Sequence, residues 1–460
     1  MTYDYCCVGQ CAPAYPGSRL RQQLFPRRWA AATALTLALT WSLPALGQSA
    51  YGHAGQSQGV GRRDAVPAGS MLSLEEAVAT ARGDQPTISA FGREAEASEQ
   101  AAVAARSLPD PQLTVGVTDF PVTGTRAFSP TADNFTMYTI GVMREQVRRS
   151  KREAEASRLR AEAFVSRAQA TVQERRIGRE VMLAWLNAVE AVAKQRLLDR
   201  LISDLNVGHQ VMEAGIPTGG STPALALQMQ AEIALAEAQR AGARAQEARA
   251  RAELARWIGA AAQRPLPTQI PALELAAGAE GATDLGAHPN VLISEAQEQA
   301  ARRQVDVARA DTKRDLSWSV MYGWRPDFGD LVTAQVTIPL LVNKAQRQNR
   351  RIAEAGARAD AALLRAQDTR RELEGAYQAT LADYRGADAQ LAIITSKAIP
   401  WLEASFQAAE ARYGAGQGSL ELPLTIVRRY VEVTIQSLEE QARRARAAAE
   451  LAYLTRDIAK

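Results

Sequence analysis

The fold is decided by residues 316–340, which read LSWSVMYGWRPDFGDLVTAQVTIPL. Apolar side chains alternate with small or polar ones on both sides of a short loop at residues 325–330. A period of two indicates strands with one apolar and one polar face, so this segment is predicted to be an antiparallel strand pair. The apolar face is predicted to be lipid-like and to carry Trp318, Val320, Tyr322, Trp324, Val336 and Ile338.

The same pattern occurs earlier in the chain. Leu113, Val115 and Val117 alternate with threonine and glycine, a loop rich in Pro, Gly and Ser follows at residues 121–133, and residues 134–144 are again strand-like. The sequence therefore predicts two strand pairs, with each strand about 10 residues long. That length matches the roughly 9 to 11 residues that a tilted strand needs to cross a bilayer.

Long helices follow each strand pair. The 67 residues from 148 to 214 contain no proline and carry heptad-like apolar positions, which predicts one helix of roughly 100 Å. A turn at residues 215–223 and a return helix at residues 224–257 complete a helical hairpin. In the second half, a long helix is predicted from residue 345 to 412, interrupted only by Pro400. A turn at 413–419 leads to a last helix that ends near Asp457.

The two halves are copies of one unit. Asp84-Gln85-Pro86-Thr87-Ile88 corresponds to Ala287-His288-Pro289-Asn290-Val291, and the offset of 203 also aligns Ala105-Arg106 with Ala308-Arg309 and Leu113 with Leu316. Matches at one offset indicate an internal duplication. The predicted organisation is a first repeat at 71–258, a linker at 259–286 and a second repeat at 287–460.

A capping-box signature, Ser73 with Glu76, begins the first repeat and opens a short helix that ends at Gly83. Pro86 opens a second helix, predicted to run to about Ser107.

The N-terminus is predicted to be a secretory signal. Arg27 and Arg28 precede an apolar run from Trp29 to Leu43, and Ala45-Leu46-Gly47 supplies small residues for cleavage after residue 47. All three cysteines fall within residues 1–47, so the processed chain is expected to have no disulfide and no N-terminal lipid anchor. Residues 48–70, rich in Gly, Ser and Gln, are predicted to be a flexible leader.

Composition argues against several functional classes. Without residues 1–47, which hold four Arg and one Asp, the formal net charge falls from +4 to +1, so nucleic acid is not an expected partner. No catalytic motif stands out, so no enzyme activity and no cofactor are expected. His209, His288 and His53 stand apart from any ligand spacing, so no metal site is predicted.

After the signal there is no run of about 18 apolar residues, so a membrane-spanning helix is excluded and the predicted strands would have to cross as a barrel. Four strands cannot close, because the smallest transmembrane barrels have eight. Two chains would supply eight strands and three would supply twelve, and long helices that enclose water favour the larger ring. The alternative is that the strand pairs cap a soluble coiled-coil rod.

Taken together, these features resemble the outer-membrane efflux protein family, the TolC family. The resemblance runs from Leu74 to about Asp457 and rests on the duplication, the phrases around Pro86 and Pro289, and the Val336-Thr337-Ile338-Pro339-Leu340 segment. It also includes Tyr413, Gly416 and Ser419 at the second turn.

This resemblance implies a mostly α-helical chain with a β-barrel portion. Three copies would form a 12-stranded outer-membrane β-barrel continuous with a periplasmic α-helical barrel. The function implied is an outer-membrane channel subunit of a tripartite efflux system that conducts substrate passively. The implied partners are further copies in a homotrimer, outer-membrane lipid, a periplasmic adaptor (membrane fusion) protein and an inner-membrane pump of the resistance-nodulation-division (RND) type.

Residues 134–143, with Lys151 and Arg152, are most similar to the branch associated with heavy-metal cation efflux. Drugs or other small organic molecules are the alternative cargo. The alternative function is a periplasmic coiled-coil adaptor or structural protein without a membrane barrel.

The hairpin turns are the predicted adaptor-docking sites, because glycine permits tight reversals and exposes backbone amides. The residues concerned are Gly215, Gly219, Gly220, Ser221, Tyr413, Gly414, Gly416, Gly418 and Ser419. In relatives, paired aspartates after the second turn narrow the tunnel. Here the matching positions are Leu422 and Thr425, and Glu421 is the possible aperture acid, with a solvated surface glutamate as the alternative.

Overall fold

The computed structural model describes residues 70–83, 85–129, 131, 135–217, 219–273, 285–415, 417 and 421–455. All of them belong to one compact unit that extends from Asp64 to Lys460. The predicted signal segment, its cysteines and residues 48–69 of the predicted leader lie outside the described residues.

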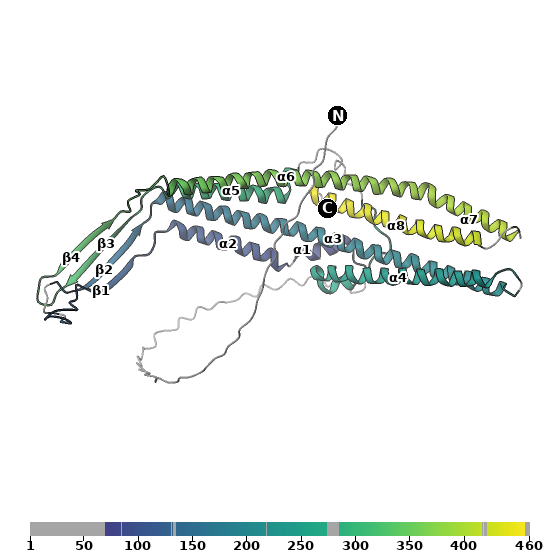
Figure 1. The fold of residues 1–460 in the computed structure, drawn as a ribbon, viewed down its shortest axis with the longest axis horizontal. Helices are drawn as coiled ribbons and strands as arrows, with labels where there is room; N and C mark the ends of the chain where they lie inside the picture. Colours follow the sequence, from purple (N-terminus) through teal and green to yellow (C-terminus); the bar gives the residue numbers. More distant parts are fainter. Residues whose placement is uncertain are drawn as a thin grey trace, which may run out of the picture. The chain divides into compact units, whose positions relative to one another are not determined.

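Each half contains a helix, two strands and a long helical hairpin in that order, and an additional α-helix precedes them in the first half (Figure 1). The first half contains α1 (Leu74–Gly83), α2 (Pro86–Arg106), β1 (Gln112–Thr118), β2 (Met137–Gln146), α3 (Arg149–Gly215) and α4 (Pro223–Ile258). The second contains α5 (Pro289–Ala310), β3 (Leu316–Trp324), β4 (Leu331–Thr337), α6 (Gln348–Ile393), α7 (Ile399–Gly414) and α8 (Glu421–Thr455).

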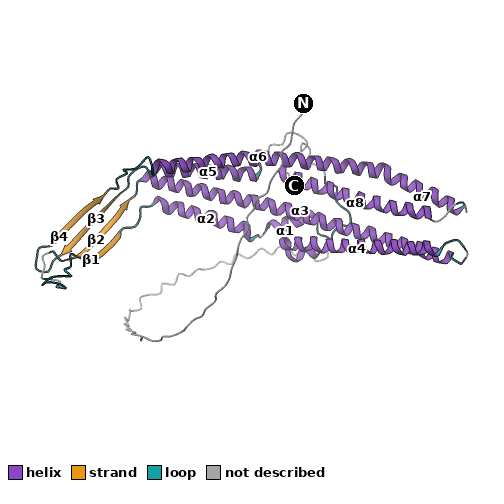
Figure 2. Cartoon of the chain, in the orientation of Figure 1, coloured by secondary structure: helices purple, strands orange, loops and turns teal. Residues whose placement is uncertain are grey.

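A single antiparallel sheet joins the two halves. Its strand order is β1-β2-β3-β4, so the pairing of β2 with β3 connects strands from different repeats (Figure 2). The predicted length of about 10 residues is right for β2 and β3, with 10 and 9 residues. It is wrong for β1 and β4, which have 7 residues each. The inner strands have a neighbour on both sides, so more of their residues are hydrogen-bonded within the sheet than in the outer strands.

Small side chains let the helices pack closely around the middle of α3. Trp185 is the main large residue there, and its indole Nε1 donates a hydrogen bond to the Leu72 carbonyl oxygen at 3.1 Å. Alanines from three other helices pack in the same cluster, which accounts for the alanine-rich composition. They are Ala77, Ala81, Ala250, Ala445 and Ala449.

The described part of the predicted linker packs on this core. Ala262 and Leu266 are buried in it, and Arg264 reaches back to α1, where its Nη1 lies 2.6 Å from Oε1 of Glu76. The predicted capping box is therefore half formed: the Ser73 Oγ accepts from the Glu76 N–H at 3.2 Å, but the Glu76 carboxylate binds Arg264 instead.

The long helix of the second repeat is interrupted just before Pro400. Residues Ile394–Ala398 form one turn of π-helix between α6 and α7. Proline cannot donate a hydrogen bond and clashes with the carbonyl of the preceding turn, so the helix widens there. The Ser396 hydroxyl donates to the Ala392 carbonyl oxygen at 2.6 Å within this segment.

His288 links the start of α5 to the end of α8. Its Nδ1 accepts a hydrogen bond from the Asn290 N–H at 3.1 Å, and its ring meets Tyr453 edge-on with centroids 5.2 Å apart. Burial, with a contribution from nearby Arg175, lowers the pKa of His288 to about 4 from its ordinary 6.5. The ring is therefore neutral at pH 7, as its role as a hydrogen-bond acceptor requires.

We expect replacement of Gly141 by alanine to destabilise the sheet. A Cβ at this position would lie 2.6 Å from Cγ of Met321 and 3.0 Å from the backbone oxygen of Val320. Such overpacking costs about 1 to 3 kcal/mol. At Gly116 the nearest atom would be 3.7 Å away, so Gly116→Ala is the matched control. Thermal unfolding of the purified proteins should show a lower midpoint for Gly141→Ala only, and equal midpoints would contradict this packing.

We also expect His288 to make stability depend on pH. Above pH 6.5 the ring is neutral in both folded and unfolded chains, whereas between pH 6.5 and about 4 only the unfolded chain takes up the proton. Stability is therefore lost as the pH falls through this range, by up to about 2 kcal/mol at pH 5. His288→Asn, which keeps a side-chain acceptor, should reduce the loss measured by helix melting at pH 7 and pH 5. An unaltered loss in His288→Asn would refute the assignment.

Candidate functional site

The register of the sheet gathers its apolar side chains on one face. Trp318 lies opposite Val336, Val320 opposite Val142, and Tyr322 opposite Ile140. Residues directly opposite in a ladder share a face, so all four strands contribute to the same surface. The full apolar face consists of Leu113, Val115, Val117, Tyr138, Ile140, Val142, Leu316, Trp318, Val320, Tyr322, Trp324, Val332, Ala334 and Val336.

The five predicted face residues of β3 and β4 are thus brought together, while Ile338 follows the last residue of β4. This face is exposed: Val115 and Val332 are 70% and 72% accessible. Tyr138 and Trp324 lie together at one border, with ring centroids 5.5 Å apart. A continuous exposed apolar surface marks a contact with another protein or with lipid.

The opposite face carries small and hydroxylated side chains. The Thr139 hydroxyl donates to the Gly116 carbonyl oxygen at 3.2 Å. Met137 and Met321 lie over Gly323 and Gly141, where a Cβ would come within 2.7 and 2.6 Å of their side chains. The two faces therefore suit different surroundings, apolar on one side and more polar on the other.

The sheet has two open edges. Strands β1 and β4 are each paired with one neighbour in the described part of the chain. An unpaired edge offers backbone donors and acceptors that another strand can satisfy.

The first hairpin turn connects α3 to α4. Thr222 caps α4 by accepting from the Leu225 N–H at 3.3 Å, and the Gly220 N–H donates to the Gly215 carbonyl oxygen at 2.9 Å. Gly219, with φ of +75°, alone among the described turn glycines needs the left-handed conformation. Gly219 and Gly220 are exposed, whereas Gly215 and Ser221 are half-buried.

The second hairpin turn connects α7 to α8. Tyr413 is partly exposed at the end of α7, and Gly414 is its last residue. The Gln417 N–H donates to the Arg412 carbonyl oxygen at 3.0 Å. Three predicted docking residues, Gly416, Gly418 and Ser419, lie outside the described residues.

The possible aperture acid, Glu421, is the exposed first residue of α8. Its carbonyl oxygen accepts from the Thr425 hydroxyl at 3.0 Å. The Glu421 side chain is exposed to water in a single copy of the chain. A role for Glu421 in an aperture stays a prediction.

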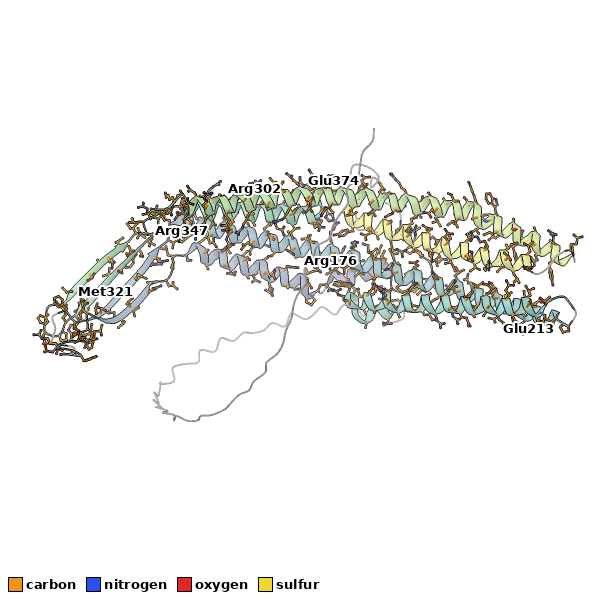
Figure 3. All side chains as sticks on the ribbon, viewed as in Figure 1. Arg176, Glu213, Arg302, Met321, Arg347 and Glu374 are labelled. Atoms are coloured by element: carbon orange, nitrogen blue, oxygen red, sulfur yellow. The ribbon has the colours of Figure 1, made fainter. Side chains whose placement is uncertain are left out.

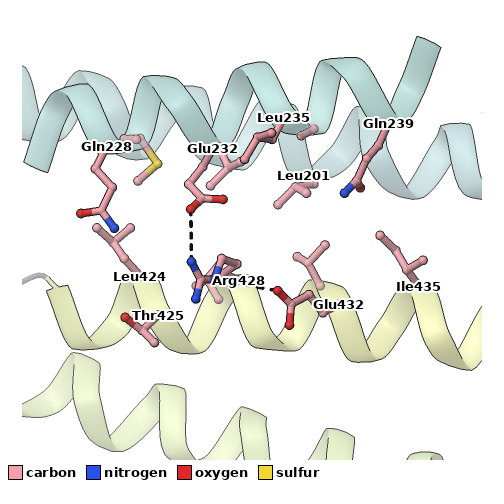
Figure 4. A pocket seen from close by; sticks show the side chains of 15 residues that line it. Leu201, Gln228, Glu232, Leu235, Gln239, Leu424, Thr425, Arg428, Glu432 and Ile435 are labelled. Carbon is pink, nitrogen blue, oxygen red and sulfur yellow. Dashed lines mark hydrogen bonds and ion pairs between the residues drawn. The ribbon is translucent and has the colours of Figure 1, made fainter. Parts of the chain in front are cut away.

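Near the turns, a groove of about 270 Å³ separates the two helical hairpins (Figure 4). Apolar side chains of α3, α4 and α8 line it, and Arg428 of α8 spans it to Glu232 of α4, with Nη1 and Oε1 3.5 Å apart. A pair this exposed contributes about 1 kcal/mol or less. Sequence reasoning did not identify this groove, because it depends on contact between residues about 200 positions apart.

The described histidines are not arranged to hold a metal. In the described part of the chain, no three His, Cys, Asp or Glu side chains come together as a metal site. His288 uses Nδ1 to cap α5, and the Nε2 of His209 lies 3.8 Å from Oε1 of Glu213.

None of the helices in the described part of the chain combines the length and the apolar composition needed to cross a bilayer.

The chain thus combines two helical hairpins with a four-stranded sheet that has one apolar face. No protein-family model matches the chain, and no curated protein sequence matches it. Solved structures do match.

The outer membrane protein VceC of Vibrio cholerae gives a TM-score of 0.69 at 19% identity, covering 83% of this chain and 95% of that one. CusC, a protein that forms a transmembrane channel, gives 0.70 at 14% identity, covering 83% and 91%. The Campylobacter jejuni outer membrane channel CmeC gives 0.69 at 12% identity, covering 83% and 85%. At these sequence identities, the TM-scores establish a shared fold alone. The TM-scores are nearly equal, so they do not assign the chain to one branch of channels.

Proposed function

We propose that the chain is one subunit of an outer-membrane channel that conducts small substrates passively from the periplasm to the exterior as part of a tripartite efflux system. The observation that carries this proposal is the four-stranded sheet with an exposed apolar outer face and two open edges. The fold shared with VceC, CusC and CmeC supports it.

The open edges require more than one copy. Backbone groups at a sheet edge cannot be left unpaired in lipid, and four strands are too few to close a barrel. In the proposed homotrimer, β1 of each copy pairs with β4 of the next, giving twelve strands. The apolar face then contacts outer-membrane lipid and the threonine-rich face lines the channel.

The helices form the periplasmic part of the proposed channel. Figure 1 shows the four strands at one end of the helices and both hairpin turns at the other. We infer that the turns meet a periplasmic adaptor, which in turn contacts an inner-membrane pump of the RND type. The exposed Gly219 and Gly220 are the described residues best suited to that contact.

For the cargo we propose heavy-metal cations, because residues 134–143, Lys151 and Arg152 resemble the heavy-metal branch. Organic drugs are the competing cargo. A wide duct needs no resident metal site, since the pump can select the substrate. The test compares a gene deletion with its complemented strain for tolerance to zinc, cobalt, cadmium, copper and drugs. Loss of drug tolerance alone would reject heavy-metal cations as the cargo.

The competing function is a periplasmic coiled-coil adaptor or structural protein. It would leave the apolar face of the sheet in water, at a cost of about 25 cal/mol per Å². We expect the native protein instead to sediment with outer membranes, to need detergent for extraction and to migrate as a heat-dissociable trimer on gels. Recovery as a water-soluble periplasmic monomer would rule out the membrane channel.

We expect a bulky residue at the first turn to impair assembly with the adaptor without affecting the channel itself. Gly220→Trp places an indole at the proposed contact, and a blocked contact centre reduces affinity about tenfold or more. Gly375→Trp is the control, because a Cβ added to this α6 glycine would have no neighbouring atom within 4 Å, and the position lies far from the turns. Cargo tolerance should fall only in Gly220→Trp, with trimer levels equal in both. Equal tolerance in both strains would argue against docking at this turn.

A further inference from the structure

Near its helix-side end, one row of the apolar face contains a charged residue. In that row Arg144 lies opposite Trp318, and Trp318 lies opposite Val336. Arg144 continues the alternation of Ile140 and Val142, so it shares their face, and its Nε donates to the Pro109 carbonyl oxygen at 3.0 Å. A tryptophan beside an arginine at the edge of an apolar surface suits the boundary between lipid tails and headgroups.

Positive charge is concentrated just beyond this row. The four connections between strands and helices, residues 106–112, 144–152, 311–316 and 337–351, contain twelve Lys or Arg and four Asp or Glu, a net charge of +8. The loops at the other end of the strands, residues 119–136 and 325–330, contain two Arg and four Asp, a net charge of −2. The charge is therefore specific to the helix side of the sheet.

The cations on α3 have partners within the chain. Nζ of Lys151 lies 2.9 Å from Oδ1 of Asp311 and 3.3 Å from Oδ2 of Asp315, and the hydrogen bond to Asp311 contributes most to raising the pKa of Lys151. Nε of Arg149 lies 2.7 Å from Oε1 of Glu153. Lys151 therefore links the start of α3 to the segment that follows α5, whereas the Arg149 pair lies within α3.

The cations at the start of α6 differ. We call Lys344, Arg347, Arg350 and Arg351 the basic group; all four are exposed. Among the described residues, none of the four has a carboxylate oxygen within 4.0 Å. Figure 3 shows Arg347 where the strands meet the helices.

Local helix electrostatics disfavour this arrangement. Arg347 occupies the N-cap of α6 without a capping hydrogen bond, Arg350 and Arg351 lie in the first turn, and that turn has no acidic residue. Cations at a helix N-terminus are unfavourable, because the helix dipole places partial positive charge there. An anion outside the chain would offset this cost.

We propose that the basic group binds the phosphates of anionic phospholipids in the periplasmic leaflet of the outer membrane. This inference rests on the proposed function, because it needs the apolar face to lie in that membrane. The row of Arg144 and Trp318 then sets the depth of the headgroups, and the basic group lies on the periplasmic side of it. Anionic lipid surfaces attract clustered Lys and Arg side chains, so four such residues are sufficient for headgroup preference.

The test compares lipid retention by the full-length protein. Trimers extracted from outer membranes are exchanged into mild detergent containing equal amounts of phosphatidylglycerol and phosphatidylethanolamine, and bound lipid is counted by native mass spectrometry. We expect about a tenfold preference for phosphatidylglycerol in the wild type. It should be lost when Lys344, Arg347, Arg350 and Arg351 are all replaced by Gln.

The matched control replaces Arg365, Arg371, Arg385 and Lys397 by Gln, because these are equally exposed cations farther along the same helical segment. It should keep the preference. Equal retention of the two lipids by the wild type, or equal loss in both fourfold variants, would overturn the proposal. If the fourfold variant fails to assemble, Arg347→Gln and Arg350→Gln should each reduce the preference by about two- to threefold, and no reduction would overturn it.

Failure of the proposed function would show earlier and differently. A wild-type protein that leaves the cell envelope without detergent has no membrane channel, whatever lipids it binds. A membrane-embedded trimer without headgroup preference leaves the channel intact and rejects only the lipid proposal.

Discussion

The constraint on which this structure depends is the unpaired backbone at the two edges of a four-stranded sheet. One face of the sheet is apolar and exposed, so the sheet is suited to lipid, but lipid does not tolerate open edges. The edges of one copy can be satisfied only by other strands. In the proposed assembly the strand count requires several copies, and the long helices would form the walls of their shared duct.

The helical part meets a different requirement. Helices as long as the 67-residue α3 need partners along their length, and the chain provides them by packing alanines from α1, α4 and α8 around Trp185. Toward the turns this close packing gives way to a groove bridged by the exposed pair of Arg428 and Glu232. The hairpins are thus held firmly near the middle of α3 and loosely at the ends that would meet an adaptor.

Much of the fold was predictable because its signals are local. Alternation at Trp318, Val320 and Tyr322 identified a strand and its apolar face, and the absence of proline identified α3. The pairing of β2 with β3 was not predictable in this way, because it joins residues from different repeats. The same is true of Arg264, whose partner Glu76 is 188 residues away and takes the carboxylate expected in the capping box.

For the candidate site, the sequence located the glycines of the hairpin turns. It did not show which of them has a positive φ, and among those described only Gly219 does. The row of Arg144 and Trp318 was not predicted either, because the two residues are neighbours only through the register of β2 and β3. The π-helical turn before Pro400 was anticipated only as an interruption, since proline identity does not determine how the helix widens.

Closure of one barrel by three copies can be examined through the mass and cross-section of the purified particle, measured by native mass spectrometry and cryo-electron microscopy in lipid nanodiscs. We expect three chains per particle and a closed ring of twelve strands around a water-filled channel. A particle of one chain, or a ring that closes with any other number of copies, would contradict this expectation.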